Sequence, residues 1–124
     1  MKAVLMASAG GPEVLAQHDV EKPDLPTPHH LRVKLSAAAI NPLDAKLRAR
    51  AIYHPDKLPA ILGCDGAGIV EKAGSNVTRF KVGDPVFFNN GGLVSCALPL
   101  QEAAEAHRLI EKGSVTGKII LTMG

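Results

Sequence analysis

The chain has 124 residues, of which 46% are hydrophobic and 21% charged, a composition typical of one globular domain. Its net charge of +2 is spread along the sequence and gives no basic stripe, so a nucleic-acid partner is not expected. No segment approaches the ~20 apolar residues that cross a membrane, so no membrane contact is expected either.

Short strands separated by turns are predicted in the first part of the chain. Residues 2–7 form a strand, and the turn at residues 9–12 leads into a second strand at residues 14–20. Residues 22–28 carry three prolines and are expected to be a loop, because proline cannot donate a hydrogen bond within a central strand. Residues 31–36 alternate apolar and polar side chains with period two, which predicts a strand with one solvated face.

A short helix is predicted to begin at Asn41-Pro42. Asparagine can cap a helix and proline tolerates its first position, so we expect a helix through Arg50 with Leu43 and Leu47 on one face. Beyond it, residues 66–73 and 86–88 are predicted strands that end or begin at glycine-containing turns.

Residues 100–112 carry the strongest helical pattern in the chain. Glu102 and Glu105 lie near its start and Arg108 and Lys112 near its end, an order that suits the helix dipole. Gly113 is predicted to end the helix. The predicted inward face consists of Leu100, Ala103, Ala104 and His107. We expect His107 to be partly buried with its hydrogen bonds satisfied. Residues 117–122 are predicted to form a last strand.

A glycine-rich run at residues 63–68 raises the question of a phosphate-binding loop. It lacks the lysine and hydroxyl residue of a P-loop, and its spacing is not G-x-G-x-x-G. The glycines are therefore predicted to allow a tight turn and a close backbone approach.

Together, four stretches of this chain resemble the medium-chain dehydrogenase/reductase superfamily, nearest its zinc-independent quinone oxidoreductase branch. These stretches are residues 62–71, 80–86, 98–110 and 117–122. The resemblance implies a mainly β fold with short helices (α+β), a GroES-like partly open β-barrel. It implies one domain over residues 1–124 without a Rossmann domain. In the family a nucleotide-binding domain stands between the two halves, so its deletion would leave a seam near residues 91–95.

The metal ligands of zinc-dependent family members are replaced here. Cys64 and Asp65 stand where those enzymes carry the His and Glu of a Gly-His-Glu motif, and Asn41 stands at the place of a metal-binding cysteine. An amide is a poor zinc ligand beside thiolate or imidazole, so no metal is predicted. Cys64 and Cys96 lie far apart and outside any CxxC pair, which favours a reducing compartment, by default the cytoplasm.

The resemblance implies that residues 41–46 line a cleft near a nicotinamide ring and a substrate. Candidate catalytic residues are Asn41, Asp44 and Tyr53, and candidate cofactor contacts are Asn41, Pro42 and Lys46. An asparagine amide can hold a carboxamide, and Tyr53 can donate to a carbonyl oxygen. The alternatives are that Asn41 caps the helix, that Asp44 is a first-turn acid, and that Tyr53 packs in the core. Lys46 departs from the aromatic residue that some quinone reductases place there.

The parent enzyme implied by the resemblance is an NADPH-dependent reductase that passes hydride to a quinone, enone or related carbonyl substrate. This chain has no glycine-rich strand-to-helix turn for the dinucleotide, so no cofactor is expected for it alone and we predict that it is inactive by itself. The alternative function is a non-enzymatic GroES-like binding or self-assembling module. Loss of a covering domain would bare apolar surface on the barrel and on the helix at residues 100–112. We therefore expect a concentration-dependent homo-oligomer.

Overall fold

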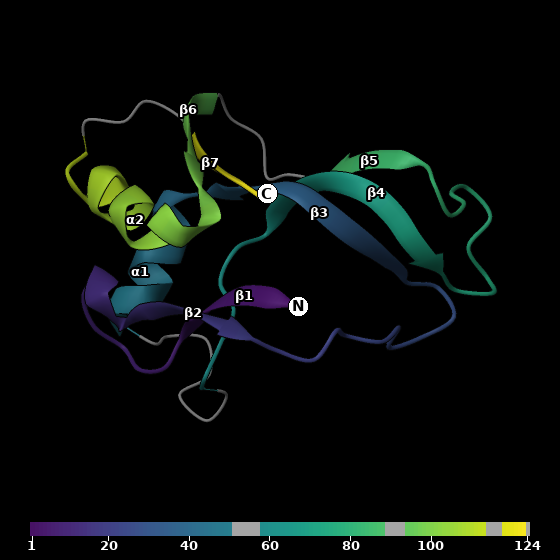
Figure 1. The fold of residues 1–124 in the computed structure, drawn as a ribbon, viewed down its shortest axis with the longest axis horizontal. Helices are drawn as coiled ribbons and strands as arrows, with labels where there is room; N and C mark the ends of the chain where they lie inside the picture. Colours follow the sequence, from purple (N-terminus) through teal and green to yellow (C-terminus); the bar gives the residue numbers. More distant parts are fainter. Residues whose placement is uncertain (51–57, 89–93, 114–117, 124) are drawn as a thin grey trace.

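The computed structural model describes residues 1–50, 58–88, 94–113 and 118–123. This part of the chain is mainly β with two short helices, and its two sheets do not close on each other (Figure 1), which confirms the predicted fold class. In the smaller sheet, β1 (Lys2–Met6) pairs antiparallel with β2 (Leu15–Asp19). The 3-10 turn η1 (Pro12–Val14) precedes β2, so this strand begins one residue later than predicted.

The larger sheet has five strands in the order β5-β4-β3-β7-β6. In chain order these are β3 (Leu31–Ile40), β4 (Asp65–Ala73), β5 (Pro85–Phe88), β6 (Val94–Pro99) and β7 (Lys118–Thr122). All neighbours are antiparallel except β6 and β7, which are parallel. Strand β6 was not predicted, and the seam expected near residues 91–95 lies partly outside the described residues.

Strand β3 is four residues longer than predicted, because it continues through three alanines that have no polar alternation. Its register against β4 shifts between Leu35 and Ala37, and after this shift the strand gains a second neighbour. Residues Ala37 to Ile40 pair with Thr122 to Ile119 of β7. The shift therefore marks the point at which β3 gains β7 as a second neighbour and becomes a central strand of the sheet.

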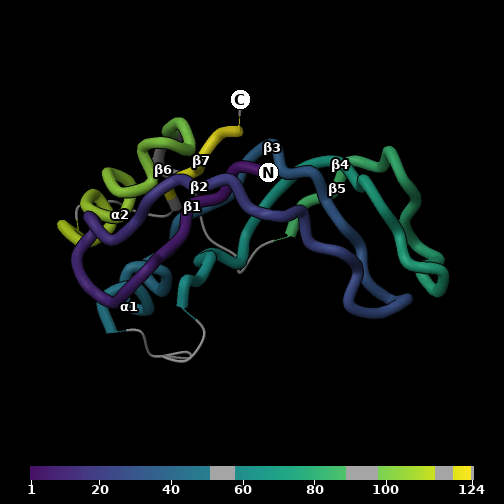
Figure 2. The backbone as a smooth tube through the Cα atoms, turned by 60° about the horizontal axis from the view of Figure 1, so that its bottom comes forward, coloured from purple at the N-terminus to yellow at the C-terminus, as the bar shows by residue number. Residues whose placement is uncertain are grey.

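The helices gather at one end of the molecule, and β3, β4 and β5 extend from it as an arm (Figures 1 and 2). Helix α1 (Pro42–Arg50) starts as predicted, whereas the second helix begins with the 3-10 turn η3 (Leu100–Glu102) before α2 (Ala103–Glu111). Gly113 ends α2 as predicted, with a positive φ of 71°. No helix in the described part of the chain is long and apolar enough to span a membrane.

The core lies between α2, α1, β3 and β7 and is built from aliphatic side chains. It consists of Ile40, Ala45, Ala103, Ala106, Ile110, Ile119 and Leu121. The buried face of α2 includes Ala106 and Ile110 in addition to the predicted Ala103 and His107. The buried residues of α1 are Asp44, Ala45 and Arg48, while Leu43, which was predicted to share a face with Leu47, is 42% exposed.

A buried arginine joins α1 to α2 and to the turn before β2. Arg48 is fully buried, and its Nε donates to Nδ1 of His107 at 3.1 Å. Its Nη1 donates to the carbonyl oxygen of Gly10 at 2.6 Å, and its Nη2 is ion-paired with Glu111. A buried charge is tolerated only when it is paired and hydrogen-bonded, so these contacts account for its position.

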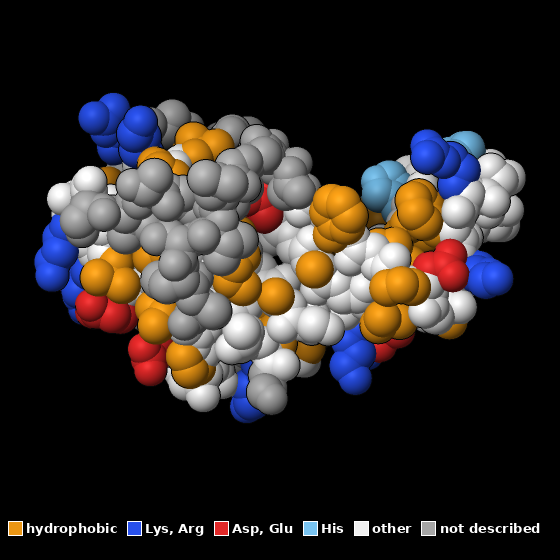
Figure 3. All heavy atoms as spheres, turned by 90° about the horizontal axis from the view of Figure 1, so that it is seen from above, with side chains coloured by type: hydrophobic (Ala, Val, Ile, Leu, Met, Phe, Trp, Pro, Cys, Tyr) orange, Lys and Arg blue, Asp and Glu red, His pale blue; other side chains and the backbone are white. Residues whose placement is uncertain are grey.

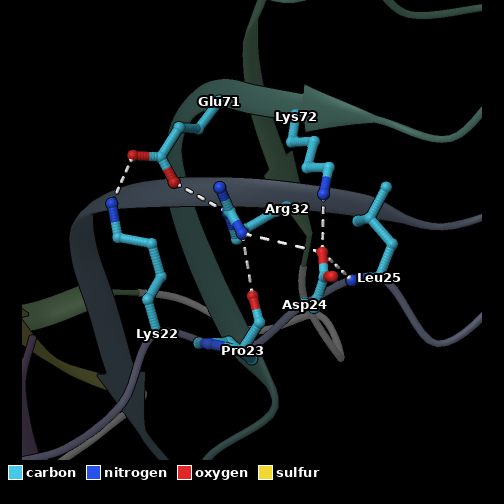
Figure 4. Close-up of polar contacts among 7 residues, drawn as sticks. All are labelled: Lys22, Pro23, Asp24, Leu25, Arg32, Glu71 and Lys72. Atoms are coloured by element: carbon cyan, nitrogen blue, oxygen red, sulfur yellow. Dashed lines mark hydrogen bonds and ion pairs between the residues drawn. The ribbon is translucent and has the colours of Figure 1, made fainter.

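Ion pairs hold the proline-rich segment after β2 against the arm (Figure 4). Glu71 of β4 accepts from Lys22 at 2.7 Å and from Nε of Arg32 at 2.9 Å. Asp24 accepts from Lys72 at 2.6 Å. The hydrogen bond from Lys22 lowers the pKa of Glu71, and that from Lys72 lowers the pKa of Asp24. Both carboxylates therefore stay charged well into the acidic range.

Stability should depend on the protonation of His107. Burial first, and then the Arg48 charge, lower its pKa from 6.5 to about 4. Between pH 6.5 and about 4, His107 is protonated in the unfolded chain but neutral in the folded chain. The free energy of unfolding should therefore fall as the pH drops from 6.5 towards about 4, by about 3 kcal/mol from this group.

Urea unfolding at pH 7, 5.5 and 4.5 measures this dependence. His107→Gln keeps an acceptor for Arg48 but removes the titrating imidazole. The free energy of unfolding should therefore change less with pH in this variant than in the wild type. His18→Gln, at an exposed position on β2, is the matched control and should follow the wild type. Equal pH dependence in wild type and His107→Gln would contradict this account.

Candidate functional site

The candidate site lies where β3 ends and β4 begins. Ala39, near the end of β3, pairs with Asp65, the first residue of β4. Asn41 follows β3 directly and precedes α1. Antiparallel pairing therefore brings together a helix start and a strand start that are more than twenty residues apart in the sequence.

Asn41 connects the two carboxylates of this junction. Its side-chain Nδ2 donates to Oδ2 of Asp65 at 2.7 Å, and its backbone N–H donates to Oδ2 of Asp44 at 2.7 Å. The N–H of Asp44 donates back to the carbonyl oxygen of Asn41 at 3.0 Å. Asp44 thus plays the part of the acidic residue in a capping box, and the Asn41 amide reaches across to β4.

Both carboxylates are nearly excluded from solvent. Asp44 is 2% exposed and Asp65 is 6% exposed. Carboxylates are buried at such positions only when donors compensate for lost hydration, and Asn41 supplies one donor to each. The Asn41 side chain is consequently held in one orientation, which is a requirement for a residue that positions a ligand.

The structure brings together only some of the predicted site residues. Asn41 and Asp44 meet as described, and Asp44 is a first-turn acid of α1, which was one of the alternatives predicted for it. Its role in a site stays a prediction. Pro42 and Lys46 are exposed and four residues apart on α1, so they share the outer face of the helix, away from buried Asp44. Tyr53 lies outside the described residues.

Asp65 is the site residue that sequence reasoning did not include. The available signal was its place in the glycine-rich run beside Cys64, which is exposed in the structure. Its distance from Asn41 follows from the β3–β4 register, which the sequence pattern alone did not fix. Among the described residues, no three His, Cys, Asp or Glu side chains are grouped to hold a metal ion.

The parallel strands β6 and β7, connected through α2, form the one described unit with the topology of a nucleotide-binding βαβ motif. The turn from β6 into the helix is Pro99 followed by Leu100–Glu102, and it contains no glycine. Glu102 precedes α2 directly and Glu105 lies in its first turn, where a pyrophosphate would need positive potential. These residues do not fit the phosphates of a dinucleotide.

Comparison with known proteins places these features in a family. A family model described as the alcohol dehydrogenase GroES-like domain matches residues 27–121. Quinone oxidoreductase from Pseudomonas aeruginosa is 41% identical over 111 residues, which cover 90% of this chain and 31% of the relative. The chain therefore spans about a third of the length of that curated relative.

Solved structures show the same likeness. Escherichia coli quinone oxidoreductase, in complex with NADPH, is 36% identical with a TM-score of 0.64, covering 71% of this chain and 26% of that structure. A cobalt- and zinc-bound alcohol dehydrogenase from Pyrobaculum aerophilum is 35% identical with a TM-score of 0.63, covering 76% and 27%. The chain belongs to the alcohol dehydrogenase GroES-like domain family of the medium-chain dehydrogenase/reductase superfamily, with quinone oxidoreductases among its relatives.

Proposed function

We propose that this chain is the substrate-side domain of an NADPH-dependent oxidoreductase that acts on quinones, enones or related carbonyls. The observation that carries this proposal is the fixed Asn41 side chain between two buried carboxylates, in a chain whose relatives are quinone oxidoreductases. We treat residues 1–124 as one such domain, with a cytoplasmic location that rests on the absence of any CxxC pair in the sequence.

In this proposal, each candidate residue has a distinct role. Asn41 faces the nicotinamide carboxamide or the substrate carbonyl, while Asp44 positions Asn41 by accepting its backbone N–H. Pro42 and Lys46 lie on the exposed face of α1 and contact the cofactor end that enters the cleft. Tyr53 donates a hydrogen bond to the carbonyl oxygen of the substrate. Asp65 joins them as a positioning residue, since it holds the Asn41 amide.

The cofactor must be held largely by a separate nucleotide-binding domain. The turn before α2 lacks glycine and carries acids, so this chain has no described place for the pyrophosphate. NADPH would supply hydride when it is bound between this chain and a nucleotide-binding domain. This chain would orient the substrate and exclude water from the cleft. We therefore derive no reaction step for the isolated chain.

We also propose that the domain works without zinc. The side-chain nitrogen of Asn41 is a hydrogen-bond donor to Asp65, and a donor nitrogen of an amide cannot bind a cation. The amide that replaces the metal-binding cysteine thus holds the carboxylate of Asp65, the residue next to Cys64, which stands at the position of the metal-binding histidine. Zinc sites in proteins need three or four thiolate, imidazole or carboxylate ligands.

Elemental analysis of protein purified without chelators tests this assignment. We expect far less than one zinc per chain. One tightly bound zinc per chain, retained through dialysis and lost in Cys64→Ser, would contradict zinc independence. Asn76→Ala, far from the site on the β4–β5 turn, is the control for any effect of purification.

The isolated chain should not oxidise NADPH in the presence of a quinone, because it lacks the phosphate-binding half of the cofactor site. Absorbance of NADPH is followed with increasing protein, and Escherichia coli quinone oxidoreductase serves as the positive control. Oxidation that saturates with NADPH and rises in proportion to the purified chain would overturn this prediction.

A quinone should nevertheless bind weakly at Asn41. Duroquinone is a suitable probe because its ring carbons are fully methylated and do not add thiols, and Cys64→Ser removes the exposed thiol as a further precaution. In ¹H–¹⁵N spectra we expect saturable shifts at the Asn41 side-chain amide. Asn41→Ala should weaken binding by about 1 kcal/mol, the contribution of one hydrogen bond.

The matched control for this substitution is Asn76→Ala, which removes an exposed amide that contacts His29 outside the site. It should leave duroquinone binding unchanged. Equal binding by wild type and Asn41→Ala, with both proteins folded by circular dichroism, would show that the site lies elsewhere.

A further inference from the structure

The edge of the five-stranded sheet at β5 is uncovered in the described part of the chain. There β5 pairs only with β4, in a regular register from Ile69–Pro85 to Gly66–Phe88. The strand has no charged residue and no bulge. Proteins usually protect an edge with such features, with short length or with proline. Here Pro85 and the four-residue length are the only protection within the strand, which leaves Val86 to Phe88 as an edge to which another strand can add.

The backbone of Phe87 is directed away from the sheet at this edge. The N–H of Val70 donates to the carbonyl oxygen of Asp84 at 2.9 Å, which sets the phase of the β4–β5 ladder. Bonded and non-bonded pairs alternate along an antiparallel ladder, so Pro85 and Phe87 have their backbone groups on the outer side. Proline loses nothing there, since its missing N–H would face solvent. Phe87 presents one N–H and one C=O outward.

The same edge carries the most exposed large apolar side chain in the described part of the chain. Phe87 is 78% exposed, and Ile69 beside it on the same face of the sheet is 44% exposed. Phe88 is 44% exposed on the opposite face, where its ring lies over Gly66. Figure 3 shows hydrophobic side chains spread over this arm. The candidate site described above does not account for the two exposed phenyl rings or for the outward backbone groups of Phe87.

We propose that the chain self-associates through β5, which pairs antiparallel with β5 of a second copy so that the two Phe87 residues lie opposite each other. Each Phe87 N–H then donates to the carbonyl oxygen of the partner's Phe87. The two phenyl rings meet across the two-fold axis on one face of the joined sheet, a favourable cross-strand pair. An identical strand on both sides makes the contact self-complementary and closed.

The charge and size of the edge favour a second copy as the occupant. In this register Val86 lies opposite the partner's Phe88, so the residues that meet are uncharged on both sides and no like charges face each other. A contact this short buries less than the ~800 Å² per partner of a standard interface, which indicates a weak dimer that forms only at high concentration. Large exposed apolar residues in the described part of the chain are absent from α2. The homo-oligomer expected from the sequence is thus assigned to β5 instead of the helix.

This inference does not rest on the proposed function, and hydrogen exchange on the wild-type chain tests it directly. The Phe87 amide should exchange at the rate of a free amide in dilute protein and become protected as concentration rises to high micromolar. Sedimentation equilibrium on the same samples should show a monomer–dimer equilibrium. A dimer whose Phe87 amide stays unprotected would place the contact elsewhere, and a strict monomer at high micromolar concentration would exclude it.

Two lysine substitutions give a matched comparison. Phe87→Lys places two like charges at the two-fold axis and should raise the dimer dissociation constant at least about tenfold. Val82→Lys alters an apolar side chain that is 62% exposed but lies before β5, and it should leave the dissociation constant unchanged. Equal dissociation constants for the two variants, or a larger effect of Val82→Lys, would overturn the assignment to β5.

Discussion

The structure depends on the position of β3 between two neighbours. One half of this ten-residue strand pairs with β4 alone, and the other half pairs with both β4 and β7. The close approach of β3 and β4 requires Gly68, because a Cβ there would collide with the backbone carbonyl of Lys34. Since β7 follows the expected seam, β3 is also where the two parts of the sequence are joined into one sheet.

The site and the helices both follow from where β3 ends. Asn41 comes directly after the strand, so the β3–β4 register sets its distance from Asp65. Helix α1 then starts at Pro42 and presents Arg48 to His107 on α2. The open edge at β5, at the far end of the same sheet, needs no rearrangement of this junction to accept a partner. The proposed substrate-side role and the proposed self-association are therefore compatible in one molecule.

Sequence patterns predicted the local elements better than their contacts. Alternation identified the start of β3, and Asn41-Pro42 identified the start of α1, because both signals are local. Strand β6 and the last four residues of β3 were missed, since their pairing partners come from distant sequence. Burial of Arg48 was also missed, because a charged residue on a short helix is ordinarily expected in solvent. The Asn41–Asp65 contact could not be predicted without the β3–β4 register. The family resemblance, in contrast, could be recognised from the order of the motifs along the chain.

The most direct test of the account is backbone hydrogen exchange across the pairing of β3 with β7. If this pairing joins the two parts of the chain, the ladder amides from Ala37 to Ile40 and from Ile119 to Thr122 should exchange together, at rates set by global unfolding. They should be as well protected as the β3–β4 amides near Gly68. Rapid exchange throughout β7, with β3 and β4 still protected, would show that α2 and β7 do not complete this fold.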